Sequence, residues 1–549
     1  MSVEPGEDDR VAESETPAEL SAQTAAEESR RRADTRHLVR ASAIVSGLGT
    51  AAKLLGLVRE MASAAIFGAT RLMDSFRVAN DITQMFATWV EAPLRAAIIP
   101  YFTQVRAEVG EQEAWRRVSN VLNTLAVFLL LVVLLLFAGA DGFVRVFATG
   151  FRDEPEAWAT SASLVRILAF SLFFSVLAVV LGSLQNLYRR QVFPALGRVL
   201  NALAVVLGVL LLGRTLGIRG YALGILAGAV ATFALQLGIL WRFRGSYRFV
   251  LRPFAPEVRR VVLIALPLFI GLTGTRIDVL IDRNFASYLP AGHLAVLGYA
   301  LIASAVVTDL VIMIAQQVLL PHFANLAVEG RHEELRRRLA QATVGYLFFM
   351  LPVTAFLCGA ARPVVDFLYA RGNFSSEAAG LTAAVLPVFA LAAPVYGINQ
   401  MLSQVFIAGG DTRTPVVIGF WRLGVKTLLS LALFFPLGIL GLAIATTASA
   451  LFRGGMLWHR LRREIRPARR EIGADVAWLL AASVAGGVVA AAAVHLTPSG
   501  ADGPFGQLAW LLAAAAASGL AFLAVAAAGG VDTLRLVRER LPARFRPRR

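Results

Sequence analysis

Long apolar runs separated by short polar loops fill most of the chain from about Ala41 onward. An α-helix needs roughly 20 apolar residues to cross the hydrocarbon core of a bilayer, and each run is about that long. We expect fourteen membrane-spanning helices, over residues 42–67, 76–104, 119–140, 158–187, 192–213, 217–241, 258–285, 292–325, 340–360, 379–408, 414–435, 437–458, 474–496 and 505–529. The pattern therefore predicts an all-α polytopic membrane protein with 14 transmembrane helices.

An internal sequence repeat divides these helices into two sets. The same residues recur at one offset of 221 positions, in Pro100 and Pro321, Pro194 and Pro415, and the segments 216–222 and 437–443. A chain rich in Leu, Gly and Ala gives some matches by chance, but a single offset that serves three separated segments favours a true repeat. Because six crossings separate the copies, both copies have the same orientation in the membrane.

The repeat predicts the domain organisation. We expect two parallel six-helix lobes and an appended C-terminal helix pair, a common plan for transporters. The expected units are a disordered cytoplasmic tail at 1–40, an N-lobe at 41–250, a C-lobe at 251–470, helices 13 and 14 at 471–530, and a basic cytoplasmic tail at 531–549.

Composition agrees with a membrane protein. Of the 549 residues, 57% are hydrophobic and 16% are charged, and the mean hydropathy is +0.64. These values are too apolar for one or two ordinary water-soluble domains. The single cysteine, Cys358, cannot form an intrachain disulfide, and neither a Cys-x-x-Cys motif nor a histidine cluster offers a metal site. We expect no cofactor and no redox chemistry.

The charge balance bears on orientation and partners. Lys and Arg outnumber Asp and Glu by 53 to 37, a net charge of +16. In a membrane protein this excess normally lies in cytoplasmic loops, so we expect contact with anionic membrane lipids and no nucleic-acid partner. The acidic N-terminal tail has no secretory signal pattern. With an even number of crossings, both termini are expected in the cytoplasm.

Ionisable side chains inside the apolar runs are the candidates for function. At the bilayer centre each costs on the order of 2.5–3.5 kcal/mol, so such groups are expected to face a wet cavity. In the second run, spacings of three and four residues place seven polar side chains on one helix face: Asp74, Arg77, Asp81, Gln84, Thr88, Glu91 and Arg95. The alternative is ion pairing that only holds helices together, of Asp74 with Arg77 or Asp81 and of Glu91 with Arg95.

Cations on other runs suggest an anionic substrate. A guanidinium chelates phosphate oxygens through paired hydrogen bonds, and an ammonium adds a point charge. For Arg95 the alternative is that its side chain extends toward the membrane surface. The predicted substrate-binding residues are Lys53, Arg59, Asp74, Arg77, Glu91, Arg95 and Arg276.

Five segments carry a family resemblance: 53–60 (KLLGLVRE), 66–69 (IFGA), 74–79 (DSFRVA), 367–374 (FLYARGNF) and 410–415 (GDTRTP). They resemble the MurJ (MviN) lipid II flippases of the multidrug/oligosaccharidyl-lipid/polysaccharide exporter superfamily. Fourteen crossings in two lobes plus a terminal pair is also the architecture of that family. The resemblance runs in unbroken order over most of the chain.

The resemblance implies a transporter and not an enzyme. It implies that undecaprenyl-pyrophosphate-linked peptidoglycan precursor (lipid II) passes from the inner to the outer leaflet of the bacterial cell membrane by alternating access. A cationic cavity between the lobes would hold the pyrophosphate, and the last two helices would help to form a groove for the lipid tail. Cell-wall synthesis proteins are implied as further partners, and a coupling ion or the membrane potential as the driving force.

Individual residues follow the family unevenly. Arg59 and Asp74 fall on essential family positions, and Lys53 replaces an arginine. Glu91 lies at the second-span glutamate of the family if one residue is deleted. We hypothesise that Asp74 and Glu91 pair with the cavity cations when the cavity is empty.

Two departures leave alternatives open. Residues 87–92 lack the Arg-Arg pair of the family, and residues 300–303 lack its eighth-span arginine. Either Arg77, Arg95 and Arg276 compensate, or the substrate is another polyprenyl-linked polysaccharide unit.

Rival classes fit the residues less well. A cation-coupled drug exporter of the same superfamily needs a deep acidic site, which the excess of arginine disfavours. A membrane-embedded glycosyl- or phosphotransferase needs a metal-binding carboxylate motif or a His-rich loop, and Asp8–Asp9 in the tail does not qualify. A scaffold without transport does not explain the polar face of the second run.

Overall fold

The computed structural model describes residues 17–188, 190–240, 247–305, 331–464, 469–495 and 503–530, and within them it leaves out the side chains of 17–41, 270–276, 332, 463–464, 469–472 and 504. The described residues form helices joined by turns, with no strand among them. The helices are α1 (Pro17–Phe67), α2 (Arg71–Val109), α3 (Glu111–Ala138), α4 (Ala140–Phe147), η1 (Thr149–Asp153), α5 (Pro155–Leu187), α6 (Val192–Leu207), η2 (Gly208–Leu212), α7 (Gly213–Leu216), α8 (Ile218–Leu240), α9 (Pro256–Ala286), α11 (His332–Gly359), α12 (Ala361–Tyr369), α13 (Ser376–Ala408), α14 (Arg413–Glu464), α15 (Arg469–His495) and α16 (Pro504–Ala528).

Many of these helices can cross a membrane. Within the described ranges, ten helices are long and apolar enough to do so. Helices α2 and α9, of 39 and 31 residues, are also long enough, but charged residues interrupt them. Of the predicted span 292–325, the structure describes only the short helix His293–Ala305 and the turn before it. The chain is an all-helical, multi-pass membrane protein.

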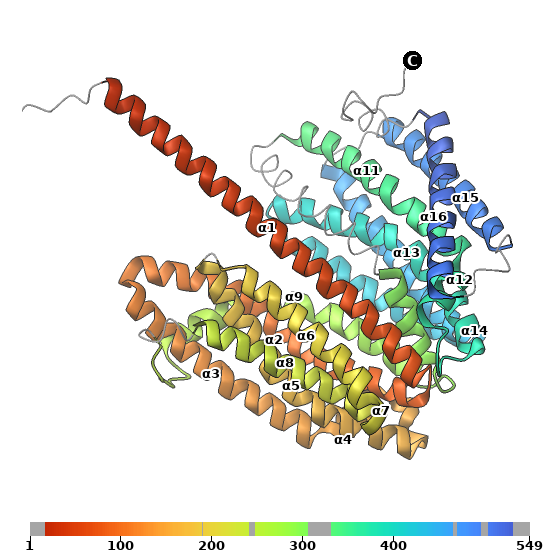
Figure 1. Cartoon of the computed structure of the whole chain (residues 1–549), viewed down its shortest axis with the longest axis horizontal. Coiled ribbons are helices and arrows are strands. Elements are labelled where there is room, and N and C mark those ends of the chain that lie inside the picture. The colour runs from red at the N-terminus through yellow and green to blue at the C-terminus, as the bar shows by residue number, and fades with distance from the viewer. Residues whose placement is uncertain are drawn as a thin grey trace, which may run out of the picture.

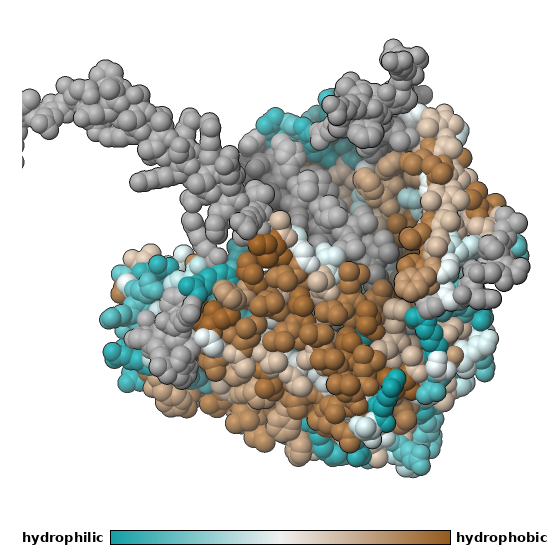
Figure 2. Space-filling view, viewed as in Figure 1, coloured by the Kyte–Doolittle hydropathy of each residue, from teal (hydrophilic) through white to brown (hydrophobic). Residues whose placement is uncertain are grey.

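The surface fits a lipid environment. Figure 2 shows a broad apolar area across the middle of one face, with hydrophilic residues toward its ends. Large apolar side chains also point outward from single helices, as do Leu207 of α6 and Leu211 of η2, which are 45% and 64% exposed. Exposed apolar patches of this extent mark membrane or protein contacts.

The first helix differs from expectation. Sequence predicts a disordered tail over 1–40, whereas the backbone of α1 is helical from Pro17 onward. Figure 1 shows α1 extending well beyond the other helices. Residues 17–40 are rich in Ala, Glu and Arg, which favour a helix, and a proline at the first turn fits a helix start. Low hydrophobicity alone does not distinguish a solvated helix from disorder.

Helix bounds recur at the offset found in the sequence. Helix α3 (Glu111–Ala138) reappears as α11 (His332–Gly359), 221 residues later at both ends. Helix α5 (Pro155–Leu187) reappears in the same way as α13 (Ser376–Ala408). In Figure 1, helices α2 to α8 form one group and helices α11 to α16 a second group. Helix α9 packs against both α2 and α14, and thereby connects the two groups.

The same turn also occurs in both halves. Gly217 has φ 60° and ψ −143°, and Gly438, its counterpart in the repeat, has φ 52° and ψ −123°. Gly438 is not helical and divides α14 into two helices, which correspond to the predicted spans 414–435 and 437–458. Essentially only glycine adopts this backbone conformation, so both turns require it.

Substituting these two glycines tests the shared turn. Gly217→Ala and Gly438→Ala are each expected to lower the free energy of unfolding by about 1–3 kcal/mol, because an L-residue is strained at these backbone angles. Gly424→Ala, in a helical part of α14 with open space around it, is the control and is expected to be neutral or stabilising. Unfolding midpoints of the purified protein in detergent measure the effect, and equal midpoints for all three variants would contradict it.

Candidate functional site

A buried carboxylate lies between two arginines where α1 meets α2. Arg59 donates from Nε and Nη2 to Oε1 of Glu60, at 3.2 and 2.8 Å, and Arg77 donates from Nη2 to Oε2 at 2.7 Å. The Glu60 side chain is 1% exposed, that of Arg77 10% and that of Arg59 35%. We call these three residues the arginine centre. It carries one net positive charge, and Arg59 is its accessible member.

Arg77 is held on its other side by the second half of the chain. Its guanidinium lies 5.0 Å from the ring centroid of Tyr299. A Cβ on Gly298 would lie 2.9 Å from its Nε, so only glycine leaves room for the guanidinium there. Nε itself is buried without a hydrogen-bond partner. The arginine centre therefore keeps a net positive charge, which only the more exposed Arg59 presents to a ligand.

Asp74 lies one helical turn before Arg77 but has different partners. Its carboxylate accepts hydrogen bonds from the backbone N–H groups of Gly292 and Ala295, both at 2.7 Å. Arg71 pairs with the same carboxylate at 3.3 Å and donates to the carbonyl of Leu289 at 3.2 Å. Asp74 thus caps the helix His293–Ala305 and contacts no cation of the arginine centre.

The sequence suggested that Asp74 pairs with the cavity cations, and the observed contacts of Asp74 differ from that hypothesis. The carboxylate that neutralises Arg59 and Arg77 is Glu60. Helical spacing places Asp74 near Arg77 along α2, but it does not show that the start of another helix offers Asp74 two N–H groups. The signal for Glu60 was its position beside Arg59 in an apolar run, since a charge in that place needs a partner.

Further bonds join the same turns. The side chain of Asn373 donates to the carbonyl of Ile66 at 2.7 Å, and its backbone N–H donates to Ala65 at 2.9 Å. Tyr299 donates to the carbonyl of Gly68 at 3.3 Å. With Asp74 and its partners, these contacts make the turn cluster, where turns of the two halves meet at one end of the helices.

Helix α9 carries a second set of buried charges. Asp278 pairs with Arg422 and with Lys426, each at 2.9 Å, and Asp282 pairs with Lys426 at 2.6 Å. Lys426 is only 1% exposed, so both carboxylates are needed to stabilise it. Asp81 of α2 pairs with Arg283 of α9. These pairs join α9 to α14 and to α2.

The remaining predicted residues fall in three different places on α1, α2 and α9. Glu91 and Arg95 line a separate open cavity of about 400 Å³ between α2, α5, α6 and α8, with both polar and apolar residues in its wall. Lys53 is exposed on α1, six residues before Arg59. Arg276 lies on α9, and its side chain is outside the described part of the structure. The polar residues of α2 recur every 3.5 residues on average, whereas an α-helix has 3.6 residues per turn. Their direction around the helix axis therefore shifts by about 20° per heptad, and those at the two ends of α2 face different neighbouring helices.

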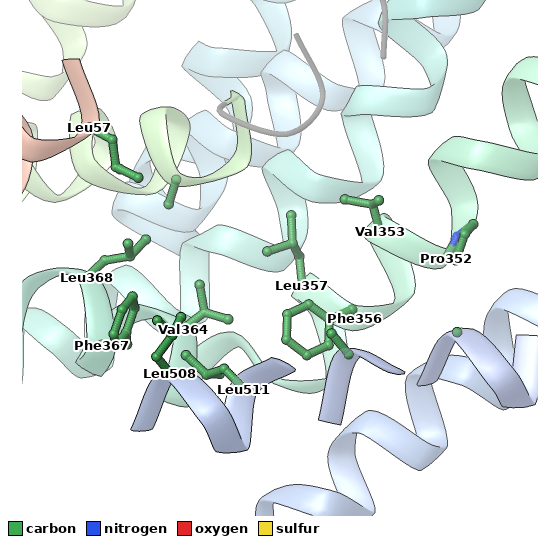
Figure 3. Close-up of a pocket in the computed structure, with 13 residues that line it drawn as sticks. Leu57, Pro352, Val353, Phe356, Leu357, Val364, Phe367, Leu368, Leu508 and Leu511 are labelled. Carbon is green, nitrogen blue, oxygen red and sulfur yellow. The ribbon is translucent and has the colours of Figure 1, made fainter. Parts of the chain in front are cut away.

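An apolar groove lies near the first helix (Figure 3). It has a volume of about 460 Å³. Leu57 of α1 lies at one side of it, and Phe356 and Leu357 of α11, Phe367 of α12 and Leu511 of α16 line the rest. Ala303, which lies one helical turn after the Tyr299 that covers Arg77, also lines the groove, so the groove lies near the arginine centre. Among the described residues no group of three or more His, Cys, Asp or Glu side chains is placed to hold a metal ion.

Comparisons with known sequences agree on one family. The family model described as "Lipid II flippase MurJ" matches residues 63–505. A Rhizobium meliloti (strain 1021) protein named "Probable lipid II flippase MurJ" is 28% identical over 436 residues, which cover 77% of this chain and 80% of that protein. A Synechocystis protein of the same name is 27% identical over 456 residues, covering 78% and 83%.

Solved structures show the same fold. A structure described as "Lipid II flippase MurJ, inward closed conformation" matches with a TM-score of 0.72 and 20% identity, over 90% of this chain and 99% of that one. An inward-facing multidrug resistance MATE family transporter of the MOP superfamily matches with a TM-score of 0.61 and 16% identity, over 75% and 94%. At these identities the likeness concerns the fold.

Removing the shared carboxylate tests the arginine centre. Glu60→Gln is expected to lower the free energy of unfolding by about 3–5 kcal/mol, because the buried guanidinium of Arg77 and the partly exposed one of Arg59 lose their shared counter-charge. Adding Arg77→Met to Glu60→Gln should restore part of the loss. Glu113→Gln, which breaks solvent-exposed pairs with Arg116 and Arg117, is the control and should cost no more than about 1 kcal/mol. Denaturant unfolding in detergent measures all three, and similar small losses for both glutamates would refute the assignment.

Proposed function

This chain belongs to the MurJ family of lipid II flippases, and from that membership we propose that it moves undecaprenyl-pyrophosphate-linked peptidoglycan precursor from the inner to the outer leaflet of the bacterial inner membrane. The observation that carries the proposal is the arginine centre, a buried cationic group inside an apolar helical bundle. Flipping breaks no covalent bond, so the protein needs to bind, enclose and release the substrate.

The arginine centre suits a pyrophosphate. Guanidinium groups bind phosphate oxygens through charge-assisted hydrogen bonds, and Arg59 is accessible enough to meet the ligand first. Glu60 holds both arginines in place while the site is empty. Pyrophosphate then competes with Glu60 for the same donors. A drug exporter that binds cations would need an excess of carboxylate at this point, whereas here the arginines are in excess.

The apolar groove suits the polyprenyl tail. Its walls are aliphatic and aromatic side chains from α11, α12 and α16, with Leu57 of α1 at one side. A long isoprenoid chain that is attached to the pyrophosphate contacts apolar side chains along the groove. The precursor thus enters with its charged group at Arg59 and its tail along α16.

The turn cluster supports the proposed alternating access. In the proposed topology two parallel six-helix lobes, 41–250 and 251–470, are followed by a helix pair in 471–530, and both termini are cytoplasmic. The turn cluster then lies on the outer side and closes the path there. Outward opening requires the lobes to separate at Asp74 and at the pair Asp81–Arg283.

The basic segments complete the proposed topology. Arginines near 460–470 and in 531–549 face the cytoplasm, where anionic lipid headgroups attract them. Cell-wall synthesis proteins are the proposed source and destination of the substrate.

Charge reversal at the arginine centre tests the function. Purified protein is placed in liposomes that carry the lipid-linked precursor, and a leaflet-accessibility assay follows its transfer. Arg59→Glu should abolish transfer, because the ligand meets a negative charge, and Arg59→Lys should retain part of it as a point charge without paired donors. Arg116→Glu, at an exposed position on α3, is the control and should transfer normally. Full transfer by Arg59→Glu would sink the proposal.

Filling the groove tests the path of the tail. Ala515→Trp places a large side chain in the groove and should weaken binding of the long-chain precursor about tenfold, while a short-chain analogue binds as before. Ala516→Trp is the matched control, since Ala516 is the next residue of α16 and is exposed. Equal binding of the long-chain precursor by both variants would place the tail elsewhere.

A further inference from the structure

A short linker segment, residues 247–255, precedes α9 and is fixed along the start of α3. The backbone N–H of Arg252 donates to Oδ1 of Asn120 at 2.6 Å, and Nδ2 of Asn120 donates back to the carbonyl of Arg252 at 3.1 Å. One turn further along α3, Asn123 donates to the carbonyl of Val250 at 2.8 Å. Side chains of α3 thus satisfy backbone groups that lie outside any helix, and they hold the linker segment in one place.

The linker segment exposes apolar and cationic side chains together. Phe249 is 78% exposed and Phe254 is 98% exposed, although burial of such rings away from water is favourable. Four exposed arginines accompany them in the linker segment and at the start of α9: Arg248, Arg252, Arg259 and Arg260. None of the four has an ion-pair partner among the residues that the structure describes. The acidic residue between them, Glu257, accepts a hydrogen bond from Asn120 at 2.8 Å. This surface therefore carries a positive charge beside exposed aromatic rings.

Two helices place the linker segment at the level of the lipid head groups. On α3, Asn120 precedes by about 10 Å the residue Val127, where large apolar side chains begin to face outward. On α9, Phe254 precedes by at most about 12 Å the residue Val262, which begins another such set. Head-group regions add roughly 5–7 Å to each side of the hydrocarbon core, so both estimates agree with that level. In the proposed topology it belongs to the inner leaflet.

An apolar groove opens beside the linker segment, between α2, α3 and α9. It has a volume of about 370 Å³. Val121 and Leu125 line it from α3, and Val258 and Val262 line it from α9, so its walls begin within a few residues of the linker segment and of Asn120. We call it the α3 groove. It is distinct from the apolar groove of Figure 3, whose walls come mostly from α11, α12 and α16.

A hydroxyl group in the α3 groove lacks a partner. Oγ1 of Thr124 is buried and makes no hydrogen bond. Other helical threonines donate to the carbonyl four residues earlier, as Thr103 does to Ile99 at 3.0 Å. Thr124 comes one helical turn after Asn120 and is therefore about 6 Å deeper in the membrane. The ester carbonyls of a phospholipid lie on the hydrocarbon side of its phosphate, so a lipid whose phosphate is at the linker segment offers this hydroxyl an acceptor.

We propose that the α3 groove and the linker segment form a binding site for an anionic phospholipid of the inner leaflet. The phosphate binds Arg252 and Arg259 through charge-assisted hydrogen bonds, Thr124 donates to an ester carbonyl, and an acyl chain lies in the α3 groove. Phe249 and Phe254 enter the head-group layer beside the bound lipid. The lipid contacts α2, α3 and α9 together, and it thereby holds α9, which also packs against α14, to the first half of the chain. The inference goes beyond the proposed function, since lipid binding here requires no transport.

A fluorescent label in the linker segment tests the site in liposomes. Cys358→Ala removes the one native cysteine, and Pro253→Cys, at an exposed position, carries the label. Nitroxide-bearing phosphatidylglycerol or nitroxide-bearing phosphatidylcholine is added at equal mole fraction to phosphatidylcholine liposomes, and each lipid quenches the label at close range. The anionic lipid should quench about three times as strongly, because the site concentrates it. Equal quenching by the two lipids would refute the anionic site.

Charge variants show which arginines bind the lipid. Arg252→Gln combined with Arg259→Gln should make the two lipids quench equally, whereas the two lysine substitutions at these positions should keep most of the anionic preference. Arg337→Gln combined with Arg338→Gln removes the same charge from exposed positions of α11 and is the control. Loss of the preference in this control would attribute it to overall charge and overturn the site.

Filling the α3 groove tests the place of the acyl chain. Leu266→Trp narrows the groove and should reduce the anionic preference, whereas Leu263→Trp, at an exposed position of α9 outside the groove, should keep it. Equal preference in both variants would show binding by charge alone and overturn the groove as part of the site.

Two further outcomes identify other ligands. Undecaprenyl pyrophosphate in excess should leave the preference for phosphatidylglycerol unchanged, and its loss would assign the site to the transported lipid. If neither nitroxide lipid quenches the label, the linker segment lies outside the membrane. That result would overturn the lipid site and favour a protein partner for Phe249 and Phe254.

Discussion

The ion pairs of one buried carboxylate with two arginines constrain how the surrounding helices pack. A charge inside an apolar bundle is stable only with a partner at hydrogen-bond distance, and Glu60 supplies that partner to Arg59 and Arg77 together. Helices α1 and α2 must therefore meet at this point. Tyr299 must cover the far side of Arg77, and Gly298 must lack a side chain. The same arrangement leaves one positive charge without a counter-charge, which is the property that an anionic ligand uses.

The internal repeat explains where this centre lies. Asp74 accepts a hydrogen bond from Ala295, its own counterpart 221 residues later, and Arg77 lies against Gly298, its counterpart at the same offset. Equivalent positions of the two copies thus face each other where the halves meet. A repeat of identical side chains would place two aspartates and two arginines in contact. The second copy instead offers backbone N–H groups and an empty glycine position, so the contact between the copies is chemically asymmetric.

Sequence patterns predict much of the fold because length and hydropathy are local properties. The predicted spans 158–187 and 379–408 match α5 (Pro155–Leu187) and α13 (Ser376–Ala408) closely. Partners of charged groups are not local, since Arg77 lies seventeen residues from Glu60 and Asp74 more than two hundred from Gly292. Spacing along α2 therefore identified polar positions without showing which neighbour each would meet. Likewise, low hydrophobicity led to a prediction of disorder over 1–40, although the Ala, Glu and Arg of residues 17–40 favour the helix that α1 forms from Pro17 onward.

Helix α2 connects the separate parts of the proposed mechanism. Asp74 closes the turn cluster, and Arg77 belongs to the arginine centre one turn further on. A ligand shifts a conformational equilibrium only through different affinities for the two states. If pyrophosphate draws Arg77 away from Glu60, α2 is displaced within one helical turn of Asp74. The hydrogen bonds of Asp74 hold the turn cluster closed.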